Sequence, residues 1–120
     1  MLELKWRTCG DDEHWCDFFN LNLDKNLGGV EGVYVIFYLG EGQPGRVVRV
    51  GQGHVADRIA THREDSDVTQ YRNKGLLVTW AKVSGANRDG VEAYLANLFD
   101  PLVGDRFPED REIEVNSPFD

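Results

Sequence analysis

The sequence lacks any apolar run long enough to cross a lipid bilayer. Its longest apolar stretch runs from Val33 to Leu39, whereas a membrane-spanning helix needs about 20 consecutive apolar residues. The N-terminus, which begins Met1-Leu2-Glu3, also lacks the basic and apolar regions of a signal peptide. These two absences predict a protein that is neither secreted nor associated with a membrane.

Cysteine is scarce, since the chain holds only Cys9 and Cys16. Two cysteines without a secretory signal predict reduced thiols and a cytoplasmic location. Together with His14 they suggest a zinc site. A structural zinc ion normally takes four protein ligands, however, and no fourth candidate lies nearby in the sequence. The zinc interpretation is therefore not favoured.

An excess of positive charge is also missing. The chain has 13 Lys and Arg against 21 Asp and Glu, a net charge of −8, which argues against a general nucleic-acid binder because phosphate contact favours basic surfaces. The charge is uneven, and residues 46–74 carry a net +2. This basic segment holds six basic residues: Arg46, Arg49, Arg58, Arg63, Arg72 and Lys74. Any phosphate contact is predicted to lie there.

No internal repeat, low-complexity tract or linker interrupts the 120 residues, so residues 1–120 are predicted to form a single domain. Composition and periodicity predict its elements in order. They are strands at 33–39 and 46–51 joined by a turn at 40–45, a helix at 54–66, a strand at 76–83, a helix from 89 to 98 or 100, and a short edge strand at 112–115. The order β-β-α-β-α predicts an α+β fold in which helices flank a small antiparallel three-stranded sheet.

The N-terminal residues 1–31 combine acidic and aromatic side chains. A short helix is predicted to begin near Asp11 or Asp12. The aromatic residues here are Trp6, Trp15, Phe18 and Phe19. They are predicted to form a small satellite core, with two alternatives: a platform on which bases stack, or an exposed patch that binds another protein.

Four segments, in order, resemble the GIY-YIG nuclease family. Gly32-Val33-Tyr34 stands at the first tripeptide, and Arg49-Val50-Gly51 stands at the second. The stretch 51–62 resembles the entry to the family's first helix, with Arg58 followed four residues later by His62. The stretch 92–101 resembles the helix that carries a metal-binding glutamate, here Glu92, and is followed by Pro101. The resemblance covers most of residues 32–104 and leaves 1–31 as an N-terminal extension.

This resemblance implies a GIY-YIG-like fold and a metal-dependent nuclease that hydrolyses phosphodiester bonds of nucleic acid, most simply DNA. The chain departs from the family pattern in three ways, of which the first two bear on the activity and none on the fold. Arg49 replaces a tyrosine, Gly104 replaces an asparagine although Asp105 adjoins it, and the gap between the two tripeptides is longer than usual. The departures keep open an alternative, in which a catalytically inactive module on the same fold binds nucleic acid or another protein.

The resemblance assigns the metal to Glu92. Hydrolysis of a phosphodiester uses a divalent cation, and Mg²⁺ (or Mn²⁺) takes one or two carboxylates together with water and substrate oxygens. The alternative is a structural role at the start of the helix. Asp89 and Glu92 have the spacing of a capping box, with Asp89 as N-cap. A carboxylate that caps its own helix is less free to bind a metal.

The resemblance makes Tyr34 the general base or the group that positions the attacking water. A free tyrosine has a pKa of about 10, so a neighbouring cation must lower it. Arg49 would lie directly opposite Tyr34 if Glu41 and Gly42 form a two-residue turn, and would then be that cation or a phosphate ligand. The alternatives are a tyrosine of the core and a solvated arginine on an edge strand.

Arg58 and His62 lie four residues apart, on one face of the predicted helix. Arg58 would clamp a phosphate oxygen, and His62 would donate a hydrogen bond or move a proton. The alternatives are that Arg58 pairs with Asp57 or Glu64, and that His62 only borders the core.

Together these roles predict that Tyr34, Arg49, Arg58, His62 and Glu92 line one concave pocket. The second helix is expected to pack on the sheet through Leu95, Leu98 and Phe99. A Glu92 carboxylate and a Tyr34 hydroxyl on opposite sides of the sheet would overturn the nuclease interpretation, whatever the motif suggests.

Overall fold

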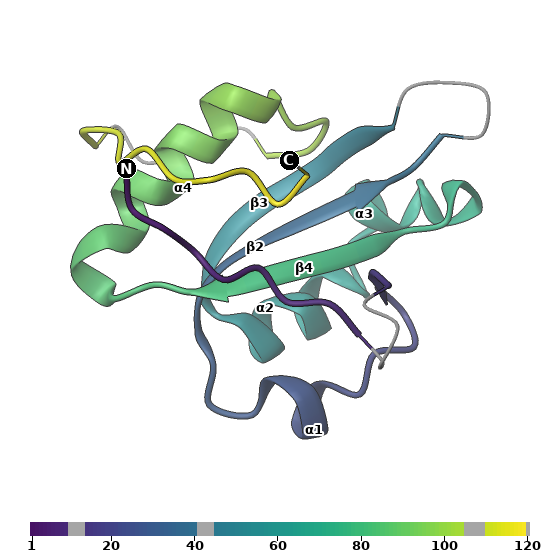
Figure 1. Ribbon diagram of the computed structural model, residues 1–120. Coiled ribbons are helices and arrows are strands. Elements are labelled where there is room, and N and C mark those ends of the chain that lie inside the picture. Colours follow the sequence, from purple (N-terminus) through teal and green to yellow (C-terminus); the bar gives the residue numbers. More distant parts are fainter. Residues whose placement is uncertain (10–13, 41–44, 105–109, 120) are drawn as a thin grey trace.

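Four strands form one antiparallel sheet, in the order β1-β4-β2-β3 (Figure 1). The computed structural model describes residues 1–9, 14–40, 45–104 and 110–119. Its strands are β1 (Cys16–Asp17), β2 (Glu31–Tyr38), β3 (Arg46–His54) and β4 (Leu77–Lys82). Its helices are α1 (Leu23–Leu27), α2 (Val55–His62), α3 (Ser66–Thr69) and α4 (Gly85–Phe99), with a 3-10 turn at Arg72–Lys74. The predicted α+β class is confirmed.

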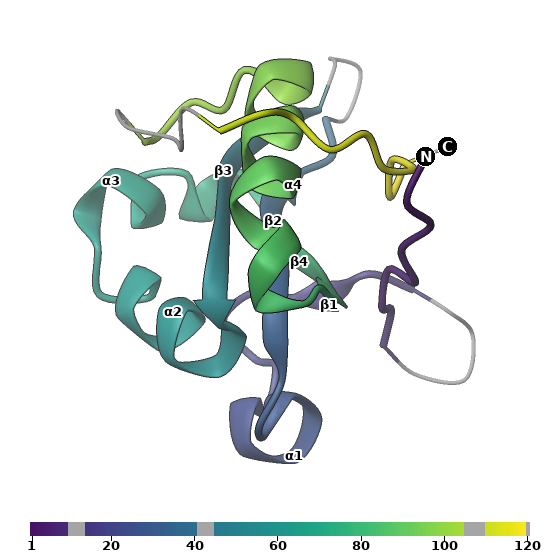
Figure 2. The same ribbon diagram turned by 90° about the vertical axis from the view of Figure 1, so that its left-hand side faces the viewer.

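Helices cover both faces of this sheet, because the central strand β2 is apolar on both sides and needs cover on each. Tyr34 and Ile36 face a core that includes Ile59 of α2. Val35 faces the other core, which includes Val91 and Leu95 of α4. Figures 1 and 2 show α1, α2 and α3 in one layer and α4 in the other. The strand β3 lies at the open edge of the sheet, between the two helical layers.

The prediction of three strands was wrong by one short strand. β1 pairs with β4 through Cys16↔Val78 and Asp17↔Leu77, and the next residue extends the pairing, since Phe18 N donates to Leu76 O at 3.0 Å. A strand of two residues is too short to show the alternation by which strands are detected in a sequence. The fully buried Cys16 and Phe18 hold it in place.

The expectation of reduced thiols was also wrong, because Cys9 and Cys16 form a disulfide. Cys9 makes an isolated antiparallel bridge with His14, which turns the chain back on itself. The two Cα atoms are 5.0 Å apart, within the range that a disulfide requires. Bonded sulfurs are not the thiolates that zinc binds, so this structure does not support the zinc interpretation of Cys9, His14 and Cys16.

Both predicted helices have different bounds in the structure. The helix expected at 54–66 ends at His62, and a separate α3 begins at Ser66 because the Asp65 side chain accepts the Asp67 N–H and caps a new helix. The helix expected from 89 begins one turn earlier, at Gly85, with Ser84 as N-cap. Leu95 of this helix is buried as predicted, whereas Leu98 is 50% exposed, so its predicted packing on the sheet was wrong.

The chain ends differ from their predictions as well. Residues 112–115 form no strand with their neighbours; Val115 makes only an isolated parallel bridge with Leu2. The predicted helix start at Asp11 or Asp12 lies outside the described residues, as do residues 41–44 of the predicted turn.

Phe18 is fully buried in the α2-side core and Phe19 packs against it, while Trp6 and Trp15 pack against the α4-side core. The aromatic residues therefore extend the two main cores, which counts against an exposed binding patch.

Within the parts of the chain that the structure describes, no helix has both the length and the apolar character needed to span a membrane.

Candidate active site

The Tyr34 hydroxyl and the His62 imidazole form the centre of the candidate site. Tyr34 Oη and His62 Nε2 are 2.6 Å apart, which is a short hydrogen bond between a strand of the sheet and the last residue of α2. Tyr34 is 0% exposed and His62 is 6% exposed. The bond satisfies two polar groups that would otherwise be costly to bury.

A glycine on β3 makes room for this tyrosine. Tyr34 pairs with Gly51, and a Cβ atom on Gly51 would overlap the Tyr34 hydroxyl oxygen and ring carbon Cζ. The Tyr34 ring therefore lies directly over the Gly51 backbone, where only glycine leaves space. The second tripeptide needs its glycine for this reason, independently of any catalytic role.

The predicted pairing of Tyr34 with Arg49 was wrong by two residues. The strand ends next to the turn, where Tyr38 pairs with Arg46, already differ by one residue from the prediction, and a bulge at Val48 adds the second, so that Ile36 pairs with Arg49. Because the shift is an even number of residues, Arg49 still faces the same side of the sheet as Tyr34. Burial raises the pKa of Tyr34, and the positive charge of Arg49 acts in the opposite direction.

Arg58 reaches the site along the edge of β3. Its Nε atom donates to the Gln52 carbonyl at 3.3 Å, and its side chain lies over Gly53, which has φ +120°. The exposed guanidinium is therefore held at the sheet edge, and its positive charge acts on Tyr34, His62 and Glu92.

Glu92 approaches from the other helical layer. Gln52 Nε2 donates to Glu92 Oε2 at 2.7 Å and also bonds Asp89 Oδ1. Because α4 begins at Gly85, Glu92 lies inside the helix and Asp89 is not an N-cap. The capping-box alternative for Glu92 was therefore wrong, and its carboxylate is turned toward the sheet edge.

The five predicted residues meet around an edge strand, and not on one face of the sheet. Tyr34 and His62 lie in the layer of α2, whereas Gln52 pairs with Val33 of the opposite core and bonds Glu92 there. The Tyr34 hydroxyl and the Glu92 carboxylate thus lie on opposite sides of the sheet at its open edge, β3, and this arrangement counts against the nuclease interpretation. The negative charge of Glu92 nevertheless acts on Tyr34, so the two groups influence each other past the strand.

Burial sets the pKa values of the site. It raises the pKa of Tyr34, although the charges of Arg49 and Arg58 lower it and that of Glu92 raises it. Arg49 therefore acts on the Tyr34 pKa in the predicted direction, but burial outweighs it and the pKa is raised overall. Burial also raises the pKa of Glu92, against the hydrogen bond from Gln52, while Asp89 raises it further. The charges of Arg49 and Arg58 lower it in part, and a divalent cation between the two carboxylates would stabilise their charged forms further.

Half of the six basic residues contact other parts of the protein through their side chains. Arg63 donates to the Phe18 carbonyl at 2.9 Å and to the Leu21 carbonyl at 2.7 Å. Arg72 lies over the Phe19 ring, 4.0 Å from its centre. Arg46 donates to the carbonyl of Asp100 at 3.3 Å. Of the six basic residues, Arg49 and Arg58 are the ones that the structure places around Tyr34.

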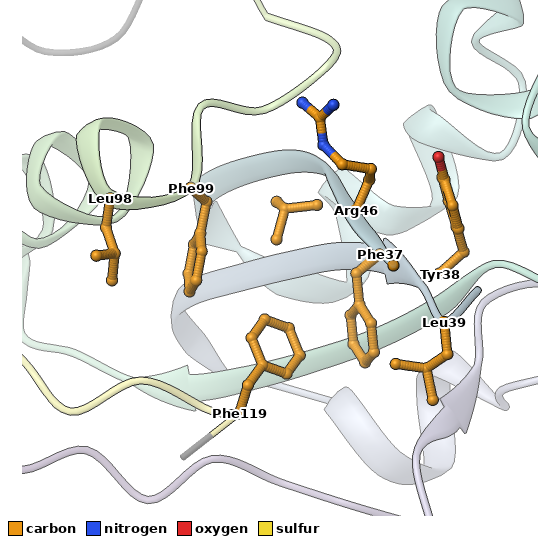
Figure 3. Close-up of a pocket in the computed structure, with 9 residues that line it drawn as sticks. Phe37, Tyr38, Leu39, Arg46, Leu98, Phe99 and Phe119 are labelled. Atoms are coloured by element: carbon orange, nitrogen blue, oxygen red, sulfur yellow. The ribbon is translucent and has the colours of Figure 1, made fainter. Parts of the chain in front are cut away.

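An apolar cavity of about 410 Å³ lies at the far end of the hairpin, on the side of α4 (Figure 3). Three side chains that line it, Leu39, Leu98 and Phe119, are 55%, 50% and 38% exposed. Among the described residues around it, Arg46 is the one charged side chain. With no acid and base facing each other, this cavity does not have the chemistry of the Tyr34 site.

The stability of the fold is expected to depend on pH through His62. Burial and the charge of Arg49 lower the His62 pKa from 6.5 to about 4, with Asp65 opposing them and Arg58 adding to them. Between these values the unfolded chain binds more protons, so stability is complete above about pH 6.5 and falls by up to about 3 kcal/mol toward pH 4. Urea unfolding at each pH, compared with His62→Gln, measures this difference. If the free energy of unfolding depends on pH equally in the wild type and in His62→Gln, the prediction is wrong. His54→Gln is the control and is expected to follow the wild type.

Comparison with known proteins finds no matching family model, no matching curated protein and no matching solved structure.

Two residues of the site were not singled out in the sequence, namely Gln52, which bonds Glu92, and Asp65, whose carboxylate lies 3.9 Å from His62 Nδ1. The sequence signal for Gln52 was its position between Gly51 and Gly53, within the second tripeptide region. For Asp65 there was no signal in the sequence except its position just before a helix.

Proposed function

We propose that this protein hydrolyses phosphodiester bonds of nucleic acid with the help of a divalent metal ion, Mg²⁺ or Mn²⁺. The observation that carries the proposal is the buried Tyr34–His62 hydrogen bond at the edge of β3, with Arg49, Arg58 and Glu92 close enough to act on Tyr34 electrostatically. A base, cations and an acid are the groups that phosphodiester hydrolysis requires, and here they would have to act together around the open edge of β3, from opposite faces of the sheet. The resemblance to GIY-YIG nucleases gives the same residues the same roles.

Each residue then has a defined task. Glu92, with Asp89 beside it, would hold the metal, which would offset negative charge on the phosphate. Arg58, exposed at the sheet edge, binds a phosphate oxygen through its planar guanidinium. Arg49 supplies a second positive charge in place of the family's tyrosine. Tyr34 accepts a proton from the attacking water and passes its own proton to His62.

The test is cleavage of plasmid and single-stranded DNA by the purified protein with Mg²⁺ or Mn²⁺. Glu92→Gln keeps the size of the side chain and removes its charge, so cleavage is expected to fall about 100-fold or more. Glu64→Gln makes the same chemical change at an exposed position of the chain and is expected to cleave like the wild type. Equal cleavage by Glu92→Gln and the wild type, or none by the wild type on any substrate, would overturn the proposal.

A second candidate is a module on the same fold that binds nucleic acid without cleaving it. Two observations favour it: Tyr34 is 0% exposed, and Tyr34 and Glu92 leave opposite faces of β3. Binding would then use Arg49 and Arg58, and would weaken steeply with salt because phosphate contacts release counterions. Salt-dependent binding of labelled DNA, lost in an Arg49→Ala/Arg58→Ala double variant and without turnover, would select this candidate over the nuclease.

A further inference from the structure

The hydrogen bond to Tyr34 leaves the other nitrogen of the His62 ring to be explained. His62 Nδ1 is buried and has no hydrogen-bond partner among the residues that the structure describes. Asp65 Oδ2 lies 3.9 Å from it, which is an ion-pair distance and just beyond a hydrogen bond. If Nε2 accepts the Tyr34 proton, Nδ1 must carry the ring proton and needs an acceptor. The carboxylate of Asp65 is in place to provide it.

Asp65 is held where it is by its own helix. Its Oδ1 atom accepts the Asp67 N–H at 3.0 Å, and its carbonyl accepts from Val68 and Thr69 at 3.1 and 2.9 Å. The other carboxylate oxygen, Oδ2, is left to face His62. The side chain is 35% exposed, so a small change of its torsion can close the remaining distance to Nδ1.

Behind Asp65 lies a polar cavity of about 230 Å³. Arg49 and Gly104 line it together with Asp65, Asp67 and Gln70. Arg49 and Gly104 are the two substituted positions of the GIY-YIG pattern, so two of its three departures meet at this cavity. The cavity gives Asp65 contact with solvent on the side away from His62.

We propose that Asp65 is a positioning residue, the third member of a chain Tyr34–His62–Asp65, which holds His62 with Nδ1 as donor so that Nε2 accepts from Tyr34. The role of this chain in catalysis rests on the proposed function, whereas its arrangement does not. The same logic orients the histidine of a Ser-His-Asp triad, in which the carboxylate fixes the tautomer and stabilises the imidazolium.

The proton balance of the step is complete. The attacking water gives a proton to Tyr34 Oη as Tyr34 gives its own proton to His62 Nε2. The water oxygen forms the new bond to phosphorus, the bond to the leaving oxygen breaks, and that oxygen takes a proton from solvent. The imidazolium is stabilised by Asp65, while Arg49 and Arg58 oppose its charge. Without Asp65, both nearby charges on His62 are positive.

The experiment compares Asp65→Asn with Asp67→Asn. Asparagine caps a helix as well as aspartate does, so Asp65→Asn is expected to fold, and Asp67 lines the same cavity and serves as the matched control. Nitrogen-15 spectra of the His62 ring are expected to show the Nδ1–H tautomer in the wild type. In Asp65→Asn, and not in Asp67→Asn, the His62 pKa is expected to fall, because the negative charge that raises it is gone.

Cleavage provides the second readout. Asp65→Asn is expected to lower the rate about tenfold and to move the acidic limb of the pH–rate profile to lower pH, which a merely structural role would not do. An Nε2–H tautomer in the wild type, or identical His62 titrations in the two variants, would overturn the role of Asp65. If the wild type shows no cleavage, the proposed function fails, and the spectra alone decide the role of Asp65.

Discussion

Gly51→Ala is expected to lower the free energy of unfolding by about 3 kcal/mol. The new methyl group would overlap the Tyr34 ring, and the ring has no free space to move into because it is fully buried between β2 and α2. The hydrogen bond from Tyr34 to His62 would be displaced, so any cleavage activity is expected to disappear as well. Chemical denaturation gives the first effect and the DNA cleavage assay gives the second.

Gly85→Ala is the matched control for this substitution. Its methyl group would meet only the end of the flexible Arg88 side chain, at 3.0 Å. Gly85 is the first residue of α4, where alanine favours the helix. This variant is therefore expected to be as stable as the wild type or slightly more stable. A Gly51→Ala protein of equal stability would mean that the Tyr34 ring does not cross β3.

Gly32→Ala is expected to be at least as destabilising, again by about 3 kcal/mol or more. Gly32 lies on β2, opposite Lys82 and Gly53. A Cβ atom there would overlap the Ala81 carbonyl oxygen and lie 2.9 Å from both Lys82 Cα and Val83 N. These are backbone atoms of β4 and of the residue that follows it, so no side chain can turn aside to relieve the contact, and β2 and β4 would have to separate.

The test of Gly32→Ala is a denaturation curve together with amide hydrogen exchange. Faster exchange is expected along β2 and β4, since their ladder is disturbed, and less so at the far end of α4. Gly85→Ala serves as control here too. Unchanged exchange on β4 would contradict the close approach of the two strands at Gly32.

The sequence predicted most elements of the fold, because their patterns are local. The apolar run of β2 and the spacing of Val55, Ile59 and His62 in α2 identify a buried strand and an amphipathic helix without any tertiary knowledge. The start of α4 was missed for a local reason as well. Its first turns contain Gly85 and Gly90, which are poor helix formers, and tertiary packing against the sheet overrides that preference.

The site was predicted less completely, because it depends on contacts between elements. The set of candidate residues came from a resemblance, and the structure brings them to one strand edge. The pairing of Tyr34 with Gly51 depends on the bulge at Val48, which alternation alone does not show. The bond from Gln52 to Glu92 joins residues 40 positions apart, and no spacing rule predicts it. The disulfide between Cys9 and Cys16 was likewise not predictable from spacing, because it depends on the backbone bridge between Cys9 and His14.

Asn116 has a consequence for the order in which the protein folds. It accepts from Leu4 N at 2.6 Å, donates to Leu4 O at 2.9 Å, and accepts at its own carbonyl from Trp6 Nε1 at 2.9 Å. These contacts join residues 110 to 112 positions apart, so the entropy of closing a very long loop delays them until the sheet has assembled. Bonds that form after the transition state leave the folding rate nearly unchanged and act on the unfolding rate. These contacts of Asn116 are therefore expected to slow unfolding, and so to lengthen the lifetime of the folded protein.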